Sequence, residues 1–268
     1  MSIGQHGGSA SIAAPEYWWY RARADLLRTA LGRYVGQAVR ILDVGSADGP
    51  SVGWLRGTGR HTALDIDPRG LGPGGVCGSA LALPFADGCF DVVAAFDVLE
   101  HCEPESVALS ELTRVLAPGG QLLLSVPAYQ WAWSDFDEEN GHHRRYTRRR
   151  AAAAVRGAGL EVERATYAFT SVFPFFAAER LLRRVRHGVR RRVWGSRSGA
   201  PADIVSLPEV SPLLERVLVG LADLDQRLLG RRDLPFGSSV LLAASKPSLP
   251  GLAGGADPSE RRGPADDR

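Results

Sequence analysis

The sequence predicts an α/β fold in which a mostly parallel sheet is covered by helices on both faces. Strand-like segments alternate with helix-like segments along most of the chain, which is the pattern of parallel strands joined by crossover helices. The segments 90–96 and 121–126 are almost continuously apolar, as expected of central strands that are buried on both sides. With 268 residues, the chain is long enough to bury a full core without disulfides or metal ions.

The predicted elements follow one another from the amino end. Strands are predicted at seven places, over 39–44, 61–65, 75–78, 90–96, 121–126, 160–169 and 239–245. Helices are predicted over 16–34, 51–56, 105–116 and 148–158. The helix 105–116 ends at the turn 117–120, because proline and glycine there cannot continue a helix. The roughly 70 residues before the last strand contain helical segments at about 174–194 and 209–230, which predicts a helical cap insertion at about 171–237.

Composition indicates one globular domain, expected over 15–247, between a mobile segment over 1–14 and a disordered tail over 248–268. Apolar residues make up 44% and charged residues 23% of the chain, which is ordinary for a globular protein. The net charge of +2 is too balanced for a dedicated nucleic-acid binder. Lys246 is the only lysine, and the abundance of arginine is attributed to codon usage rather than to phosphate recognition.

Cysteine usage and the amino-terminal sequence predict a cytoplasmic protein. The three cysteines, Cys77, Cys89 and Cys102, have no C-x-x-C spacing, so they indicate reduced thiols rather than a zinc site or a disulfide framework. Residues 1–15 contain no apolar stretch of the kind found in secretory signals. No transmembrane helix is predicted, because the chain has no run of about 18 apolar residues.

Three predicted strand ends carry residues suited to a nucleoside. In open α/β sheets, ligands bind at the carboxyl ends of the strands near the switch in strand order. The first strand ends at a glycine-rich bend, 43–49, the second ends at Asp65, and the third is followed by small residues over 78–85. Glycine lets a ligand approach the backbone, and a carboxylate at the second strand end accepts hydrogen bonds from both hydroxyls of a ribose.

The charges at the bend distinguish between two classes of cofactor. A dinucleotide site typically uses G-x-G-x-x-G to hold a pyrophosphate at a helix N-terminus, whereas residues 45–49 here are G-S-A-D-G. The carboxylates of Asp43 and Asp48 would repel a pyrophosphate. They suit a ligand with a cationic end, such as the amino group and sulfonium of S-adenosylmethionine. The sequence therefore favours a methyltransferase over an NAD enzyme.

At these residues the sequence resembles class I S-adenosylmethionine-dependent methyltransferases of the type 11 group. The motifs that carry the resemblance are ILDVGSADG, ALDID, LPFADGCFDVV, FDVLEH and RVLAPGG. A less characterised subgroup shares EYWWY, VPA, DEENGHHRRYT, FP and LPFGSS, so the resemblance covers about 12–247. It implies a Rossmann-like, doubly wound seven-stranded sheet, mostly parallel with the last strand antiparallel. It also implies an enzyme that uses S-adenosyl-L-methionine as its cofactor.

The resemblance assigns cofactor-binding roles to individual residues. Asp43 would orient the bend and the amino group of the cofactor, and Asp65 would bind the ribose hydroxyls with Ile66 beside the adenine. The residues expected along the methionine part are Gly45, Ser46, Ala47 and Gly49. Those expected at the adenine edge are Gly78, Ser79 and Ala80. Those expected near the methionine end are Phe96, Asp97 and His101.

Two positions depart from the family pattern. Ala47 replaces the usual middle glycine of the bend, and its Cβ is tolerable where φ is negative, with a modest loss of affinity. Ser79 replaces the usual aspartate that contacts the adenine amino group. Its hydroxyl still accepts that hydrogen bond, although more weakly than a carboxylate does. Neither change is expected to abolish cofactor binding.

The segment 129–146 is the candidate acceptor site, because it follows the fifth predicted strand and is too polar and aromatic for an ordinary connection. His142 is the best candidate for a general base, since histidine titrates near neutral pH. The alternative role is a structural hydrogen bond from His142 to Asp135 or Asp137. The catalytic candidates are thus His142, Tyr129 and Asp135. No metal site is predicted, because Asp-His-x-His spacing is absent.

Several charged and aromatic residues are candidates for acceptor binding. They are Tyr17, Trp18, Trp131, Trp133, His143, Arg144, Arg145 and Tyr146. The two arginines suit a phosphate or carboxylate on the acceptor, and the alternative is ion pairing with Asp137, Glu138 or Glu139. The aromatic rings either stack on a ring of the acceptor or pack within the site.

The insertion contains an apolar stretch followed by an arginine-rich amphipathic one, over 173–194. Such a helix either contacts an anionic membrane surface or presents a solvated arginine face. A membrane contact would suit a lipid-linked acceptor.

Taken together, the sequence predicts a methyltransferase acting on a small-molecule acceptor, with specialised metabolism as the expected setting. Three alternatives stay open at this point: another reaction of the same cofactor, such as cyclisation, methylation of a lipid-linked or sugar acceptor at a membrane, and a non-catalytic cofactor-binding scaffold. No nucleic-acid partner is expected. The motifs do not specify the acceptor, the methylated atom or the oligomeric state.

Overall fold

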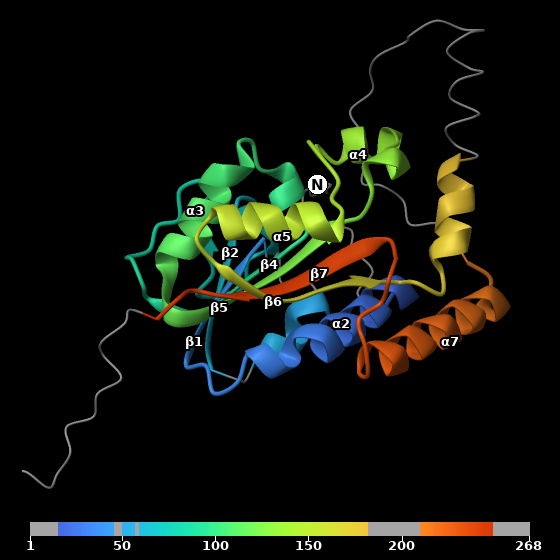
Figure 1. Cartoon of the computed structure of the whole chain (residues 1–268), viewed down its shortest axis with the longest axis horizontal. Helices are drawn as coiled ribbons and strands as arrows, with labels where there is room; N and C mark the ends of the chain where they lie inside the picture. The colour runs from blue at the N-terminus through green and yellow to red at the C-terminus, as the bar shows by residue number, and fades with distance from the viewer. Residues whose placement is uncertain (1–15, 46–49, 57–58, 182–209, 249–268) are drawn as a thin grey trace, which may run out of the picture.

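The computed structural model describes residues 16–45, 50–56, 59–181 and 210–248 (Figure 1). It contains a seven-stranded sheet in the order β3-β2-β1-β4-β5-β7-β6. The strands are β1 Arg40–Val44, β2 Arg60–Asp65, β3 Val76–Cys77, β4 Phe90–Phe96, β5 Leu116–Pro127, β6 Glu161–Ala168 and β7 Ser239–Ser245. This is the Rossmann-like, doubly wound arrangement that the sequence predicts.

Among the described strands, β7 alone runs against the direction of both its neighbours. The pairs β3-β2, β2-β1, β1-β4 and β4-β5 are parallel, whereas β7 is antiparallel to both β5 and β6. Because β7 reverses direction between them, β5 and β6 run the same way. The chain turns from β1 to β2 on one side and reaches β4 on the other, so β1 and β4 flank the switch in strand order. The ends of these strands are where such a sheet binds its ligand.

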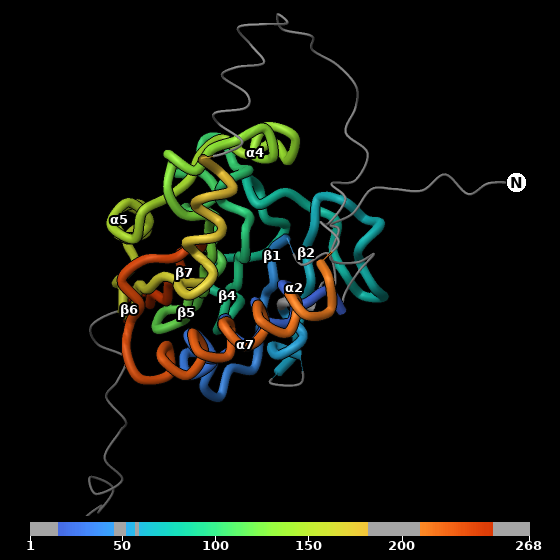
Figure 2. The backbone as a smooth tube through the Cα atoms, turned by 90° about the vertical axis from the view of Figure 1, so that its right-hand side faces the viewer, coloured from blue at the N-terminus to red at the C-terminus, as the bar shows by residue number. Residues whose placement is uncertain are grey.

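Helices cover both faces of the sheet, as Figures 1 and 2 show. On one face, α3 (Glu105–Val115) packs on β5, and α5 (Arg148–Gly157) packs on β6 and β7. On the other face, α2 (Trp18–Leu31) contacts β7 and packs along α7 (Pro212–Leu229). The apolar residues of α2 recur at helical spacing and are buried, which explains why this segment is a helix against the sheet.

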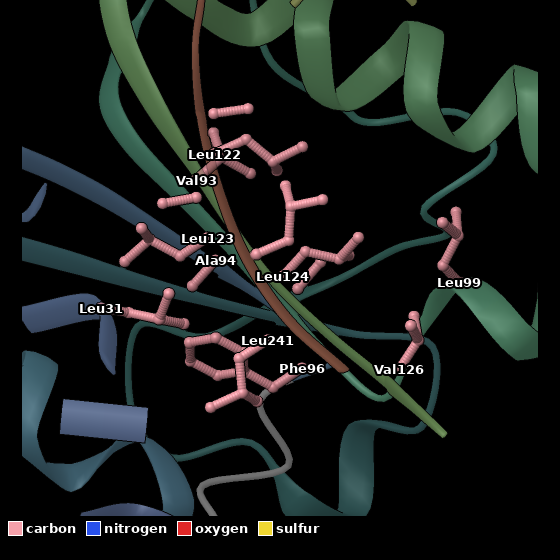
Figure 3. Close-up of a cluster of buried hydrophobic side chains, with 14 of the residues drawn as sticks. Leu31, Val93, Ala94, Phe96, Leu99, Leu122, Leu123, Leu124, Val126 and Leu241 are labelled. Atoms are coloured by element: carbon pink, nitrogen blue, oxygen red, sulfur yellow. The ribbon is translucent and has the colours of Figure 1, made fainter. Parts of the chain in front are cut away.

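The core lies in the central strands. Figure 3 shows buried side chains of β4, β5 and β7 gathered with Leu31 of α2 and with Leu99. Leu122, Leu123 and Leu124 of β5 are all fully buried, because successive side chains point to opposite faces and helices cover both. This is the physical reason that β4 and β5 have no polar alternation.

Most element boundaries agree with the sequence prediction, and a few are corrected. Strands 90–96 and 239–245 are confirmed to the residue, whereas β5 begins earlier than predicted, at Leu116. Residues 117–120 are still an interruption, since Phe90 pairs with Leu116 and Val92 with Gln121. The helix predicted at 51–56 is a 3₁₀ turn, Pro50–Leu55.

Several short elements have no counterpart in the sequence prediction. They are the helix α4 (Asp135–Glu139) and the 3₁₀ turns Gly32–Tyr34, Pro68–Gly70, Leu99–His101 and Gln130–Ala132. All are too short to produce a helical periodicity in the sequence.

The proposed cap is described in two pieces. Residues 173–181 begin a helix after β6, and α7 follows residue 210. The carboxylate of Asp225 on α7 is fully buried and accepts hydrogen bonds from the backbone N–H and hydroxyl of Ser171. The expected mobile segment 1–14, residues 182–209 of the insertion and the tail beyond residue 248 lie outside the described residues.

Two further features concern the described residues as a whole. Cys77, Cys89 and Cys102 are free thiols. None of the described helices combines the length and the apolar character needed to cross a bilayer.

Leu123→Ala is expected to lower the free energy of unfolding by about 2–5 kcal/mol, because it leaves a cavity in the fully buried centre of β5. Urea denaturation measures this loss. Val107→Ala on the exposed side of α3 is the matched control, with an expected change within about 0.5 kcal/mol. Equal losses in the two variants would contradict the assignment of β5 to the core.

Candidate active site

The first part of the site is the end of β1. Asp43 is buried, and its Oδ2 lies 3.5 Å from Nε2 of His61 on the neighbouring strand β2. Gly45 follows at φ +70°, and its N–H donates to the carbonyl of Leu64 at 2.7 Å. The backbone therefore turns sharply out of the sheet just after the buried carboxylate. The remaining bend residues predicted to bind cofactor, Ser46, Ala47 and Gly49, lie outside the described residues.

Glycine is required at position 45 because φ is positive there and because a side chain would overlap a neighbouring residue. A Cβ built on it would lie 2.4 Å from Cγ2 of Val98, which follows β4. The backbone at the end of β1 thus passes directly against the loop that follows β4. This close approach joins the two strand ends at the switch in strand order.

The second part of the site lies at the ends of β2 and β3. Oδ1 of Asp65 accepts a hydrogen bond from the backbone N–H of Asp67, and Ile66 between them is 74% exposed. Gly78 donates its N–H to the carbonyl of Asp65 at 2.9 Å. The small residues Ser79 and Ala80 follow, and the Ser79 hydroxyl accepts from the N–H of Leu81. An acid, an exposed apolar side chain and a small-residue turn are therefore adjacent, as the sequence predicts.

The third part is the end of β4. Asp97 follows buried Phe96 and has φ +57°, a left-handed conformation that is uncommon outside glycine. Its carboxylate accepts from Nη2 of Arg23 at 2.7 Å and from the hydroxyl of Ser125 at 2.9 Å. Arg23 also donates to Ser125 at 2.9 Å. The charged network therefore ties α2, β4 and β5 together beneath this part of the site.

Sequence reasoning missed Arg23, although a signal was present. Buried residues of α2 include Tyr20, Leu26, Leu27 and Ala30, so Arg23 falls on the apolar face of an amphipathic helix. A buried guanidinium needs a charged partner, and this position alone indicates one.

The fourth part is the loop 128–146, which leaves the end of β5 and returns to it. The N–H of Tyr129 donates to the carbonyl of Tyr146 at 2.7 Å, and the N–H of Tyr146 donates to the carbonyl of Pro127 at 2.9 Å. The loop is therefore closed at its base. Its residues His142 and His143 lie on the return path.

His142 is held by a buried carboxylate. Its Nδ1 lies 2.9 Å from Oδ1 of Asp137, which is fully buried and also accepts from Nε of Arg145 at 2.7 Å. Burial alone would raise the pKa of Asp137, but the hydrogen bonds from His142 and Arg145 outweigh it and lower the pKa to about 2. Asp137 is thus a carboxylate at neutral pH. The partner of His142 is Asp137, one of the two predicted alternatives, and not Asp135 at the start of α4.

The loop brings His142 to two residues that follow β4. The rings of His142 and His101 meet edge to face with centroids 4.6 Å apart. The backbone N–H of His143 donates to the carbonyl of Glu100 at 2.8 Å. Donor atoms of Glu100, His101 and His142 all lie within 4.8 Å of one another. Metal-site motifs are recognised by the spacing of ligands along the chain, and the sequence has none. These three residues come together only when the chain folds.

Arg144, Arg145 and Tyr146 are buried in the structure and have partners within the protein. Arg145 pairs with Asp137, one of the predicted partners, whereas Arg144 pairs with Glu103 and Glu105, which the sequence did not predict. The hydroxyl of Tyr146 donates to Oε2 of Glu105 at 2.6 Å, and burial together with this bond raises the pKa of the phenol. These side chains fix the loop onto the segment that follows β4.

An aromatic cluster lies where the ends of β5 and β6 meet the start of β7. Tyr129 stacks on Tyr167 with centroids 5.3 Å apart and on Trp131 at 5.9 Å. Phe173 contacts Tyr129 at 5.5 Å and Phe236 at 5.6 Å. Burial and a hydrogen bond with Tyr167 raise the pKa of Tyr129, so its phenol stays protonated at neutral pH. Trp131 and Phe236 remain partly exposed, so the cluster has an open side.

The remaining predicted acceptor residues lie at the rim or within the protein. Trp18 is buried in α2, and Tyr17 at the start of that helix contacts it at a centroid distance of 6.0 Å. Nε1 of Trp133 donates to Glu138 at 3.3 Å, and His143 is exposed. Trp19, which the sequence did not single out, stacks on Phe169 after β6 at 5.8 Å.

Comparison with known proteins connects this geometry to a family. Residues 42–124 match a family model described as a methyltransferase domain. A malonyl-(acyl-carrier protein) O-methyltransferase from Erwinia billingiae is 32% identical over 134 residues, which are 47% of this chain and 49% of that protein. A demethylmenaquinone methyltransferase from Beutenbergia cavernae is 34% identical over 116 residues, 40% of this chain and 46% of that protein. Residues 42–124 therefore match a methyltransferase domain, and the chain is similar there to S-adenosylmethionine-dependent methyltransferases. The chain spans about half the length of these curated relatives.

Solved structures share the fold of the methyltransferase domain over more of the chain. The cyclase SpnF is 20% identical with a TM-score of 0.52, covering 84% of this chain and 81% of its own. A methyltransferase from Thermotoga maritima is 14% identical with a TM-score of 0.53, covering 88% and 93%. At these identities the likeness concerns the fold alone.

The described residues fit this cofactor class at two places. At Asp65, the acid stands beside exposed Ile66, which suits a ribose and an adenine ring. At Gly45, the missing Cβ lets the backbone at the end of β1 pass close against Val98 after β4, so the two strand ends that flank the switch in strand order meet.

Gly45→Ala is expected to destabilise the domain by more than about 1–2 kcal/mol, because the left-handed conformation and the overlap with Val98 add together. Gly36→Ala is a matched control, since Gly36 also has a positive φ but its Cβ would meet no atom within 4 Å. Urea denaturation compares the two, and calorimetry with S-adenosylhomocysteine should show weaker binding only for Gly45→Ala. Identical behaviour of the two variants would refute the close approach at Gly45.

Proposed function

We propose that the chain transfers the methyl group of S-adenosylmethionine to a small molecule that carries an apolar or aromatic group. The observation that supports this most is the aromatic cluster around Tyr129, which lies at the same sheet edge as Asp43 and Asp65 and has an open side. Arg145 connects the cluster to the buried Asp137, because its guanidinium also lies 5.9 Å from the ring of Phe176.

We call the part of the site that would bind S-adenosylmethionine the donor half, and we assign it to the ends of β1, β2 and β4. When bound, S-adenosylmethionine supplies a methyl group on a positively charged sulfur. Asp65 would hold the ribose and Ile66 the adenine, while buried Asp43 would orient the bend that begins at Gly45. Asp97 would present a negative charge toward the methionine end, with its position fixed by Arg23. These roles follow from the chemistry and placement of each side chain.

The pair Asp137–His142 is assigned to the proton of the acceptor. Because Nδ1 of His142 is bonded to a carboxylate, Nε2 is the nitrogen left to accept a proton. Asp137 stabilises the positive charge that His142 would then carry, as the carboxylate does in other Asp–His pairs. A base in this position contributes about 10²–10⁴-fold to the rate when the acceptor is a hydroxyl or an ammonium group.

We call the part of the site that would bind the methyl acceptor the acceptor half, and we assign it to the aromatic cluster. Two relatives are named a demethylmenaquinone methyltransferase and a probable phthiotriol/phenolphthiotriol dimycocerosates methyltransferase. Stacked rings such as Tyr129 and Trp131 bind flat or apolar groups and exclude water from the reacting atoms. We therefore assign an apolar or aromatic acceptor in preference to a strongly charged one, since the buried arginines already have carboxylate partners.

We further propose that an anionic lipid surface is where the acceptor is delivered. Exposed apolar side chains mark both ends of the insertion: Phe175 and Leu181 on the segment 173–181, and Leu213, Leu214 and Val217 at the start of α7. The sequence between them includes arginines at 183, 184, 186 and 190–192. Apolar anchors beside clustered positive charge suit a membrane of anionic lipids.

The proposed activity is tested by incubating the protein with S-adenosylmethionine and acceptors of quinone, aromatic, lipid-carrier and sugar type. Formation of S-adenosylhomocysteine together with a methylated product is the expected result. An acceptor transformed without loss of the methyl group would instead favour cyclisation chemistry. Calorimetry that detects no binding of S-adenosylhomocysteine by well-folded protein would contradict the assignment of the donor half.

His142→Ala is expected to lower turnover by about 10²–10⁴-fold while leaving the Kd for S-adenosylhomocysteine nearly unchanged, because His142 lies on the acceptor side of the site. Single-turnover kinetics and calorimetry measure the two quantities. Full turnover in the variant would remove any chemical role from His142.

The lipid-surface proposal predicts co-sedimentation with vesicles of phosphatidylcholine and phosphatidylglycerol but not with phosphatidylcholine alone. The double variant Phe175→Ser and Leu213→Ser should weaken this binding, because it removes two exposed apolar anchors. Val39→Ser, which changes an equally exposed residue before β1, should bind vesicles as the unmodified protein does. Unaltered binding by the double variant would exclude these residues as anchors.

A further inference from the structure

We infer that Glu100, His101 and His142 form a binding site for one divalent transition-metal ion. Each residue offers one ligand atom, and these three atoms lie within 4.8 Å of one another. Ligands of a tetrahedral zinc ion lie about 3.3 Å apart, given bonds of about 2.0–2.1 Å. Small side-chain adjustments therefore close the cluster around an ion.

The strongest observation is the state of Glu100. Its side chain is 1% exposed, and its Oε2 has no hydrogen-bond partner among the residues that the structure describes. A buried carboxylate oxygen without a partner is costly, because it has lost water and gained nothing in return. A divalent cation at this position would give this buried oxygen a partner.

His142 is oriented as a metal ligand is, because its Nδ1 is bonded to the carboxylate of Asp137. Metal-binding histidines almost always donate their other ring nitrogen to a carboxylate or a backbone carbonyl, which fixes the ring. The ring of His101 meets that of His142 edge to face at a centroid distance of 4.6 Å, so the two imidazoles are already neighbours.

The donor set specifies the chemical class of the ion. Two imidazoles and one carboxylate suit Zn²⁺, Co²⁺ or Fe²⁺, whereas Ca²⁺ and Mg²⁺ prefer sites built from oxygen. His101 is exposed while Glu100 is buried, so the site is open on one side. Three protein ligands and an open position are the pattern of ions that also contact water or substrate.

An ion at this site changes the role of His142, and this step rests on the proposed function. A hydroxyl of the acceptor would occupy the open position and lose its proton to solvent water. Its oxygen, still held by the ion, would then take the methyl group from the sulfur, which leaves as a neutral thioether. With the ion bound, Nε2 of His142 would be a ligand, and without the ion it would be the base assigned in the proposed function.

The test uses the full chain, prepared without a polyhistidine tag and stripped with a chelator. Equilibrium dialysis against Zn²⁺ should give about one bound ion per chain. Addition of Co²⁺ should give visible absorption bands of a site with nitrogen and oxygen ligands. Glu100→Gln and His101→Ala should each weaken Zn²⁺ binding by more than about tenfold. His143→Ala is the matched control, since it removes the neighbouring exposed ring and keeps the backbone bond to Glu100.

The outcomes separate this inference from the proposed function. No stoichiometric Zn²⁺ binding, or equal binding by His101→Ala and His143→Ala, overturns the metal site. Calorimetry of S-adenosylhomocysteine in the presence of chelator tests the donor half on the same material. Circular dichroism of each variant ensures that a loss of binding reflects a missing ligand, and Glu100→Gln preserves the shape of the buried side chain.

Discussion

The acceptor side of the site depends on one buried charge, the carboxylate of Asp137. It accepts hydrogen bonds from the ring of His142, the guanidinium of Arg145 and the backbone N–H of Ser134. A buried carboxylate is tolerated only where such partners satisfy it, so removing one of them leaves the charge less well compensated. The three partners come from both sides of α4, and a single carboxylate therefore fixes the path of the whole loop between β5 and α5.

The two halves of the site are built by different means. The donor half consists of strand ends, where backbone pairing sets the positions of Asp43, Gly45 and Asp65 before any side chain is considered. The acceptor half consists of side chains from a closed loop and from the insertion, held by ion pairs and ring contacts. Strand ends give a binding edge whose geometry is fixed by the sheet. A loop held by side chains can change its sequence without disturbing the sheet.

The sequence predicted the strand ends that carry Asp43 and Asp65, because the signals for them are local. Asp43 and Asp65 each follow an apolar strand, and parallel strands bring such ends to one edge of the sheet. The acceptor half needed information that is not local. The partner of Arg144 is Glu105, and Glu100 meets His142 across two loops, so no spacing along the chain reveals either contact. Arg23 is an intermediate case. Its position on the apolar face of α2 is a local signal that it has a charged partner, but the partner, Asp97, is distant in the sequence.

The position of β7 has a consequence for how the chain folds as it is made. β7 is the last strand in the sequence, yet it lies between β5 and β6 and is the only strand that β6 pairs with. Until residue 245 has left the ribosome, β6 lacks the strand it pairs with in the sheet, and the contact of Tyr167 with Tyr129 is not yet fixed by that pairing. The cofactor edge, built from β1 to β5, can form during synthesis, whereas the surface for the acceptor is assembled last.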